Sequence, residues 1–533
     1  MSATFPDARP ARRGWLDWLR RELAPSHERK VRTLILICGA VLSVILSTVL
    51  EVPELAVSAY MVFFISKENK RVTTLVGVLG LIGLTVGVAV SLLLYKLTYG
   101  HPEWRIPSMA IVLFLGMYLF RVLVLGPLVF LLGFVIAVTQ SIGELVPSPE
   151  LLVRAILWIW VAVAYGVALT VALNLLFLRV PDGPPKPLPK SLFVPDAFTN
   201  PAHVRFALKV TLAAMFCYFF YTGADWFGIH TAFITCIFIA LETTGATLYK
   251  GMLRAVGCVI GGLLALFTIL VLIPHMETLA SLVILVACAS AIAAWVGTGT
   301  ERIAYAGLQI AFAFFYSLFP GFQPYAPDID LTNVRDRVVG ILFGLAVMTF
   351  VFQYIWPERA LDRLRDILRQ ALPQVARLLF IPGPGTPVNE ARQKANALIA
   401  EISRELEKAR REAEVMSLEI NEPRPPERIS SGDLETMLSR AEHVLALATS
   451  LNSDSAWQEW QEMPPGAQAA ESILRNAIAR RVEHAAAHEG AKDADANLSL
   501  AFARWTETVQ QMSLRGSRIA LISQITAEAR RLG

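Results

Sequence analysis

The sequence predicts an all-α, multi-pass membrane protein made of two parallel repeats of about six transmembrane helices, followed by a polar helical bundle. Three observations predict this fold. Of the 533 residues, 55% are hydrophobic and 17% are charged, whereas soluble proteins carry about 25% charged residues. The apolar residues gather in runs of about 20, the length that crosses a hydrocarbon core about 30 Å thick. The two halves of the apolar region also share a pattern of glycine and threonine.

Residues 1–30 form a basic segment that precedes the first apolar run. In the stretch RRGWLDWLRREL, Trp15, Trp18, Leu19 and Leu23 fall on one face of a helix. Basic amphipathic helices of this kind lie on anionic membrane surfaces. We therefore expect either an interfacial helix on the cytoplasmic leaflet or a short solvated helix. The basic region is too long for a cleavable signal peptide.

Residues 31–178 are predicted to form the first membrane half. A short apolar run there is closed by the charged sequence KENKR, and the turn between Arg121 and Gly126 is hardly polar. Runs of this length and composition predict membrane-crossing helices. We expect six crossings, over residues 31–50, 53–66, 72–95, 107–124, 126–140 and 151–177.

A proline-rich linker, residues 179–203, separates this half from the second membrane half, residues 204–356. Proline removes a backbone donor and clashes with the preceding turn, so this linker cannot be helical throughout. Six further crossings are expected, over residues 206–221, 226–241, 252–273, 279–296, 303–319 and 338–356.

Residues 357–533 are polar, and their apolar residues recur at helical spacing. We expect a cytoplasmic helical bundle of four or five elements in this region. It contains no recognisable catalytic constellation, and regulation, oligomerisation and support of the membrane core all remain open as its role.

The distribution of basic residues predicts the topology. Lys and Arg gather in KENKR, in the proline-rich linker, in ETTGATLYKGMLR and beside Arg302, whereas SIGELVPSPE and GADW carry none. Because cytoplasmic loops are enriched in Lys and Arg, we expect both termini in the cytoplasm. The formal net charge of +4 is too small to indicate nucleic-acid binding.

The two halves share one pattern at a constant spacing along the chain. When Glu68 is placed on Glu242, Thr73 falls on Thr247. Each half then carries glycines spaced four apart, which let a neighbouring helix approach closely. Because each half has an even number of crossings, the repeats are predicted to be parallel. The helix-packing glycines of this pattern are Gly83, Gly87, Gly257 and Gly261.

Three charges interrupt the apolar sequence of the second half at Glu242, Lys250 and Arg254. Lys250 and Arg254 are one helical turn apart, so one interpretation makes them interfacial anchors whose heads reach water or lipid phosphates. Glu242 would then offset those cations or the helix N-terminus. The alternative makes them part of a gate or substrate path, because charges within membranes tend to be functional.

The stretch DWFGIHTAFITCIFIALETTGATLYKGMLRAVGCVIGG resembles the motif of the fusaric acid resistance and aromatic acid exporter family. A second segment, VRDRVVGILFG, resembles the start of that family's last transmembrane helix. The matching positions are Trp226, Thr231, Gly245, Thr247, Lys250, Arg254, Gly257 and Gly261 in the first segment and Arg337, Gly340 and Gly344 in the second. The first half departs from the motif, with Gly80 where Arg254 would be.

The resemblance implies an efflux permease of the bacterial inner membrane that exports aromatic carboxylic acids or related toxic molecules. Family members typically work with a periplasmic adaptor (membrane fusion) protein and an outer-membrane channel, and the question of a homo-oligomer stays open. The implied partners are thus a small-molecule substrate, the lipid bilayer and those two proteins, without nucleic acid.

Further substrate or coupling candidates are polar or aromatic residues in the apolar runs. Arg121 is interpreted either as a partner of an anionic substrate or, preferably, as a turn residue. His230 suits proton coupling through its ordinary pKa near 6.5, although a structural hydrogen bond is the commoner role. Tyr305, Phe312 and Tyr316 belong to an aromatic helix face that lines a path or packs, and Gln309 is expected to form interhelical hydrogen bonds.

Several function classes find no support in the sequence. It contains no GxxxxGK[ST], HExxH or GxSxG motif, so we expect no enzyme, no cofactor and no metal. An ion gradient, most simply of protons, would then drive export. A passive anion channel of the same superfamily is the alternative. A major-facilitator carrier is disfavoured by KENKR after the second crossing, and a membrane scaffold is a further option.

Overall fold

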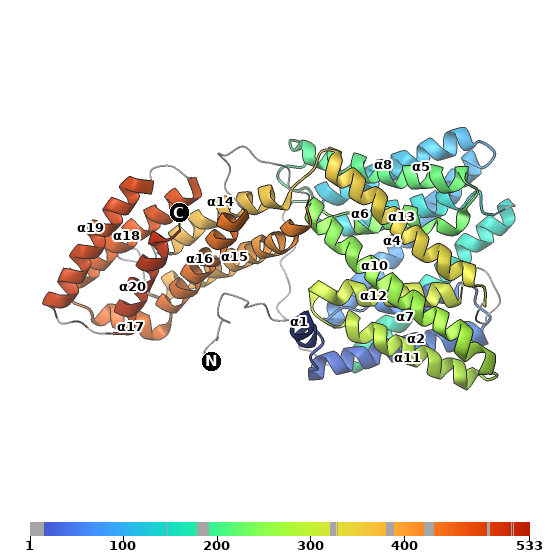
Figure 1. Ribbon diagram of the computed structural model, residues 1–533, viewed down its shortest axis with the longest axis horizontal. Coiled ribbons are helices and arrows are strands. Elements are labelled where there is room, and N and C mark those ends of the chain that lie inside the picture. Colours follow the sequence, from blue (N-terminus) through green and yellow to red (C-terminus); the bar gives the residue numbers. More distant parts are fainter. Residues whose placement is uncertain are drawn as a thin grey trace. The chain divides into compact units, whose positions relative to one another are not determined.

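The computed structural model describes residues 15–146, 148–178, 191–319, 327, 329–379, 388–419, 431–487, 491–512, 514 and 516–532. Most of the predicted proline-rich linker, residues 179–190, lies outside the described residues. The described chain is built from helices (Figure 1). The predicted all-α, multi-pass membrane fold is confirmed.

The chain divides into two compact units. One contains residues up to Glu242 and Thr247–Pro357, and the other contains Thr243–Ala246 and the chain from Glu358 onward. The first unit holds every apolar run predicted to cross the membrane, and we call it the membrane unit.

The described residues of the first half of the membrane unit form seven helices. The short α1 (Trp15–Glu22) comes first, and each of the six predicted apolar runs lies on one helix after it. The ends of α5 and α6 place a turn at residues 123–125, where the sequence predicted one. The six helices are α2 (His27–Val49), α3 (Leu55–Ile65), α4 (Lys70–Thr98), α5 (Pro102–Val122), α6 (Gly126–Ser141) and α7 (Pro149–Phe177).

The second half repeats this order. Its helices are α8 (Pro201–Gly223), η1 (Phe227–Ile229) with α9 (Thr231–Ile239), α10 (Thr244–Phe267) extended by η2 (Thr268–Leu272) and η3 (Ile273–His275), α11 (Leu279–Gly297), α12 (Glu301–Leu318) and α13 (Leu331–Tyr354). Within the described chain, eight helices are long and apolar enough to cross a membrane; the apolar segments Leu55–Ile65, Val129–Ser141 and Phe227–Ile239 are shorter.

The helix α1 is tied to the rest of the membrane unit by polar contacts. The Arg29 guanidinium at the start of α2 donates to the backbone oxygen of Glu22 at 2.7 Å and also to that of Trp295 at the end of α11. The Glu22 carboxylate accepts a bond from Thr300, just before α12. Its placement on a membrane surface stays a prediction.

The two halves match helix for helix at the spacing that the sequence indicates. The helices α2 and α8 begin at His27 and Pro201, and α4 and α10 begin at Lys70 and Thr244. Both pairs keep the spacing that relates Thr73 to Thr247. Local hydrogen bonds match as well, since the hydroxyl of Thr73 accepts from the N–H of Lys67 at 2.9 Å. Its proton is within bonding distance of the carbonyl oxygens of Lys67 at 3.4 Å and Asn69 at 3.1 Å.

In the second half, the hydroxyl of Thr247 makes the same two bonds to the backbone of Leu241. It accepts from the N–H at 3.0 Å and donates to the carbonyl at 3.2 Å. Lys67 and Leu241 are themselves equivalent positions of the two halves. Each threonine therefore closes the same sharp connection between a short helix and a long one, and the repeat extends to individual side chains.

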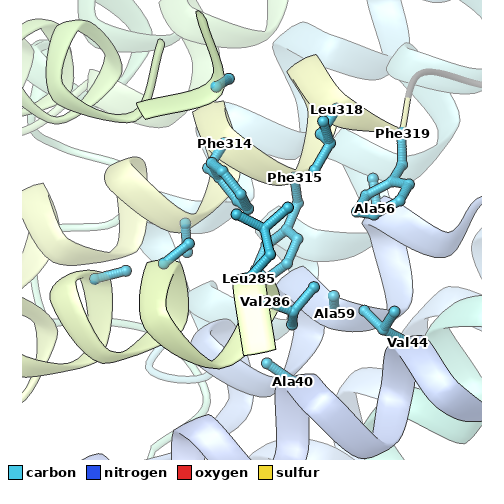
Figure 2. Packing of buried hydrophobic residues seen from close by; sticks show 14 of the residues in the cluster. Ala40, Val44, Ala56, Ala59, Leu285, Val286, Phe314, Phe315, Leu318 and Phe319 are labelled. Atoms are coloured by element: carbon cyan, nitrogen blue, oxygen red, sulfur yellow. The ribbon is translucent and has the colours of Figure 1, made fainter. Parts of the chain in front are cut away.

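The two halves pack against each other through two apolar clusters. In one, α2 and α3 of the first half meet α11 and α12 of the second. Figure 2 shows its small residues Ala40, Ala56 and Ala59 beside the larger Leu285 and Phe315. The other cluster joins α5 of the first half to α8, α9 and α13 of the second. Each half therefore covers the short helix of the other.

The spaced glycines lie where helix backbones approach. A Cβ on Gly257 would lie 2.5 Å from the backbone oxygen of Ala306, and one on Gly261 would lie 2.5 Å from that of Ile310, both on α12. On α13, a Cβ on Gly340 would lie 2.9 Å from the backbone oxygen of Ile229.

The other predicted packing glycines differ in how closely a neighbouring helix approaches them. A Cβ on Gly344 would lie 2.7 Å from the backbone oxygen of Ala232 on α9. In the first half, one on Gly87 would lie 2.9 Å from the side chain of Val135, and Gly83 is partly exposed. At the predicted packing positions, the glycines of the second half therefore meet helix backbone, whereas Gly87 meets a side chain.

The second unit is a helical bundle with more elements than the sequence predicts. Its described residues contain seven α-helices rather than four or five, because Ser453 caps a separate short helix and the predicted stretch 497–532 breaks before Gly516. The helices are α14 (Ala360–Leu379), α15 (Val388–Val415), α16 (Ser431–Leu451), α17 (Asp454–Glu462), α18 (Pro465–Ala487), α19 (Ala491–Gln511) and α20 (Ser517–Arg530), with η4 (Met416–Leu418) after α15.

Candidate functional site

Arg254 lies on α10 and points into the membrane unit, where it is 2% exposed. Its Nε donates to the hydroxyl of Thr235 on α9 at 3.0 Å. Its Nη1 donates to Gln309 Oε1 at 2.8 Å and to the hydroxyl of Tyr305 at 3.3 Å, both on α12. Its Nη2 has no partner. The anchoring interpretation requires a charged head that reaches water or lipid, and it is therefore wrong for Arg254.

Arg337 lies on α13 and approaches the same region from the opposite end of the bundle. It is 7% exposed, and its Nε and Nη1 have no hydrogen-bond partner. Its guanidinium carbon lies 4.7 Å from the ring centroid of Tyr316 and 5.1 Å from that of Phe312. Aromatic faces attract cations, but they accept no conventional hydrogen bond from these N–H groups.

Phe312 on α12 connects the two arginines. The guanidinium carbon of Arg254 lies 5.6 Å from the ring centroid of Phe312, so both cations lie near the same ring. Tyr60 of α3 meets that ring edge-on, with centroids 4.8 Å apart. Phe238 of α9 lies 5.9 Å from the Arg254 guanidinium. The result is a buried pair of cations between aromatic side chains contributed by α3, α9 and α12.

No carboxylate neutralises these two cations within the part of the chain that the structure describes. Neither guanidinium has an Asp or Glu oxygen within ion-pair distance there. Removing an ion from water costs several kcal/mol, and the cost is recovered only when the charge is paired and hydrogen-bonded. The site therefore has the properties of an anion site: two positive charges, unused N–H donors and planar apolar surfaces.

The repeat shows that the fold does not require these polar residues. In the first half, the position equivalent to Arg254 holds Gly80, that equivalent to Arg337 holds Val163, and that equivalent to Gln309 holds Val135. The same helices pack there without buried cations. The charges of the second half are therefore an addition to the architecture, which favours a functional role over a structural one.

The structure brings three of the sequence candidates into this site. Tyr305 accepts from Arg254, and Tyr316 stacks under Arg337. Lys250 is partly buried one turn before Arg254, and its Nζ lies 5.1 Å from the ring centroid of Tyr305. These three residues and the two arginines form one continuous group along α10, α12 and α13.

Two candidates lie beside the site. His230 Nδ1 is 2.9 Å from the carbonyl oxygen of Phe227, which is the structural hydrogen bond considered from the sequence, and the ring is within electrostatic range of Arg337. Thr231 is buried, and its hydroxyl has no partner. Both residues belong to the start of α9, next to the glycines of α13.

Three candidates lie elsewhere. Trp226 is 37% exposed and faces Arg335 at 6.0 Å. Arg121 is in the last turn of α5, with its guanidinium 5.0 Å from the ring of Phe206, so it sits at the predicted turn. Glu242 is exposed in the connection before α10. None of these contacts Arg254 or Arg337.

Sequence reasoning left some of the site unassigned. Arg337 entered only through the resemblance, Gln309 only as an interhelical bond, and Phe312 only as part of an aromatic face. A position-by-position comparison of the two repeats could have selected them, since each replaces a smaller or apolar residue of the first half.

Comparisons with known proteins find similarity over part of this chain. Residues 197–425 match the family model described as "Aluminium activated malate transporter". That segment is less than half of the chain and contains all of α8–α13. The match thus covers the half that carries the two buried arginines.

Curated relatives match over a similar length. The chain is 36% identical over 203 residues to the "Multidrug resistance protein MdtO" of Shigella flexneri, covering 38% of this chain and 30% of that protein. It is 34% identical over 203 residues to the protein of the same name from Escherichia coli strain K12, covering 38% and 29%. The matched region thus spans less than a third of these relatives.

Proposed function

We propose that this protein is an efflux transporter of the bacterial inner membrane that moves aromatic carboxylates or related organic anions, and that it is not an enzyme. The observation that carries the proposal is the pair of buried guanidiniums, Arg254 and Arg337, which have unused N–H groups, share the ring of Phe312 and have no carboxylate partner among the described residues. The similarity to a malate transporter family and to multidrug resistance proteins supports it.

The chemistry of the site favours a small planar anion. A carboxylate accepts charge-assisted N–H bonds from a guanidinium, and Nη2 of Arg254 and Nε and Nη1 of Arg337 are free to donate such bonds. Phe312, Phe238 and Tyr316 offer ring faces and edges to the body of an aromatic acid. The substrate class follows from charge and shape together.

We propose that the site works within a fixed topology and a larger assembly. Lys and Arg enrichment places both termini and the proline-rich linker in the cytoplasm. The end of the bundle where α3 and α13 begin then faces the periplasm. A periplasmic adaptor, an outer-membrane channel and self-association follow from the family resemblance, and an inward proton gradient is the proposed source of energy.

The test compares variants that remove one buried charge each. Cells lacking the native gene would express wild type, Arg254→Gln or Arg337→Gln, and the accumulation of labelled benzoate would be followed. Both variants should reach the membrane in normal amounts and lose export. Arg335→Gln is the matched control, because Arg335 lies on the same helix but is 60% exposed and paired with Asp336.

Full export by both buried-charge variants would refute the anion site. A second arm separates the transporter from its alternative, a passive anion channel. Collapse of the pH gradient should stop uphill export by a proton-driven transporter. Anion current through a channel would persist under the same treatment.

A further inference from the structure

Glu54, which the proposed function does not use, is an unusual residue at the end of the bundle where α3 begins. It is 8% exposed and precedes α3, yet its side chain makes no capping hydrogen bond. Its backbone is left-handed, with φ 63° and ψ 39°. Residues other than glycine rarely adopt this conformation, and such strain gathers at functional sites.

The fold does not require this conformation. The equivalent residue of the second half is Gly228, which could adopt a positive φ at low cost but has none. Glu51, three residues earlier, is different: both it and its repeat partner Asp225 have φ 51°. The strain at Glu51 therefore belongs to the shared architecture, whereas the strain and buried charge at Glu54 are particular to the first half.

Tyr316 links Glu54 to the anion site. This residue of α12 is within electrostatic range of both Glu54 and Arg337, and its ring contacts the Arg337 guanidinium. An ionised Glu54 would thus share one low-dielectric region with any anion held by Arg337. Like charges in such a region repel strongly, so ionised Glu54 and a bound anion disfavour each other.

Among the described residues, few other titratable groups surround Glu54. The last two turns of α2, residues 42–49, carry none. Tyr165 of α7 bonds to Ser47, which lies 3.2 Å from the hydroxyl of Ser58 one turn into α3. The groups that neighbouring elements bring to this end are Glu51 in the same connection, Tyr165 on α7, Tyr316 on α12, and Arg337 with His230 beyond it.

We propose that Glu54 is a proton-linked gating residue, and that its carboxyl must be protonated before an anion occupies the site at Arg337. This inference rests on the proposed anion transport. Protonation removes the competing negative charge and leaves the unused N–H groups of Arg337 to the substrate. By reciprocity, a bound anion raises the proton affinity of Glu54, so anion and proton bind together at this end of the bundle.

The test measures binding of benzenesulfonate to the full chain in detergent by calorimetry. This anion of a strong acid stays ionised throughout, so any pH dependence belongs to the protein. Because the carboxyl must be protonated before the anion binds, the affinity of wild type should fall from about pH 6 to about pH 8, by at most about tenfold per pH unit. Glu54→Gln should bind tightly at both, and Glu51→Gln should keep the wild-type dependence.

His230 supplies the competing explanation, since it also lies near Arg337. If His230→Gln abolishes the pH dependence and Glu54→Gln retains it, the assignment to Glu54 is overturned. If Glu54→Gln fails to fold, a measurement of proton uptake by the wild-type protein still tests the assignment. Calorimetry in two buffers of different ionisation enthalpy should detect net proton uptake, at most about one proton per bound anion, at one or more pH values between about 6 and 8. No uptake across this range would equally overturn the assignment.

The two proposals fail in distinguishable ways. Binding that is tight but unaffected by Glu54→Gln would reject the gate and leave the anion site in place. Absence of benzenesulfonate binding to wild type at either pH would reject both.

Discussion

Arg254 donates to the side-chain oxygen of Gln309 at 2.8 Å, and this bond joins a buried cation to a neutral amide rather than to a carboxylate. The amide satisfies one donor without removing the positive charge. In the first half the same two positions hold Gly80 and Val135, so neither partner is needed to pack these helices. The pair therefore preserves a net charge in the interior for a ligand to neutralise.

The variants Gln309→Glu and Gln309→Met should separate charge from hydrogen bonding. Glutamate keeps the bond to Arg254 and supplies the missing negative charge, so the protein should stay folded and lose most benzoate binding. Methionine leaves an unsatisfied buried donor, which costs about 1–3 kcal/mol of stability, but it retains the charge and should retain binding. Calorimetry and thermal unfolding in detergent measure both effects. Wild-type affinity in Gln309→Glu would contradict an anion site at Arg254.

The helices of the membrane unit could be predicted from sequence because membrane crossing imposes both length and composition on them. Even the short α3 was found, because charged residues close its apolar run. The repeat could be predicted from Thr73 and Thr247, whose hydrogen bonds are the same in both halves. Local chemistry and the bilayer therefore determine most of this architecture.

The site was less predictable because burial depends on the direction of a side chain across the bundle. Arg254 lies one helical turn after Lys250, near the expected membrane surface, and this position suggested an anchor. Only the hydrogen bonds to α9 and α12 show that its side chain points inward. Arg337 lies on α13, the last helix of the membrane unit. It is therefore too far from Arg254 in the sequence for a local pattern to indicate that the two lie close together. The strain at Glu54 has no sequence signal at all.

The close approach of α10 to α12 predicts opposite effects at two glycines. A methyl group at Gly257 would meet the backbone oxygen of Ala306 and the Cβ of Gln309 at 2.5 and 2.6 Å, so Gly257→Ala should destabilise the protein by about 1–3 kcal/mol. Gly80, the repeat equivalent of Arg254, has only a leucine methyl at 3.7 Å. Gly80→Ala should be neutral or stabilising by up to about 1 kcal/mol.

Thermal unfolding of both alanine variants in one detergent gives the comparison. Equal effects at the two positions would show that helix propensity, rather than contact with α12, decides the outcome. The larger changes Gly257→Leu and Gly261→Leu should reduce the amount of folded protein further, since each side chain would have to displace helix backbone.

The shared threonine connection predicts equal losses in the two halves. Thr73→Val and Thr247→Val each remove one acceptor from a backbone N–H and one donor to a carbonyl. Each should cost about 1–3 kcal/mol, and the two losses should agree within about 0.5 kcal/mol, as expected for distant equivalent sites. A loss confined to one half, measured by thermal unfolding, would mean that the repeats differ in stability despite their matching geometry.

The ion pair of Arg518 and Glu471 predicts how the second unit responds to a lost charge. Arg518 Nη2 lies 2.6 Å from Glu471 Oε1, and both side chains are at most 2% exposed. Arg518→Met leaves a buried carboxylate with only Arg475 at 3.7 Å, so it should cost about 3–5 kcal/mol. Arg531 pairs with Glu528 at 3.4 Å but is 65% exposed, and Arg531→Met should cost at most about 1 kcal/mol. Hydrogen exchange of α17, α18 and α20 in the full chain measures the difference, and equal protection in both variants would mean that other contacts hold these helices together.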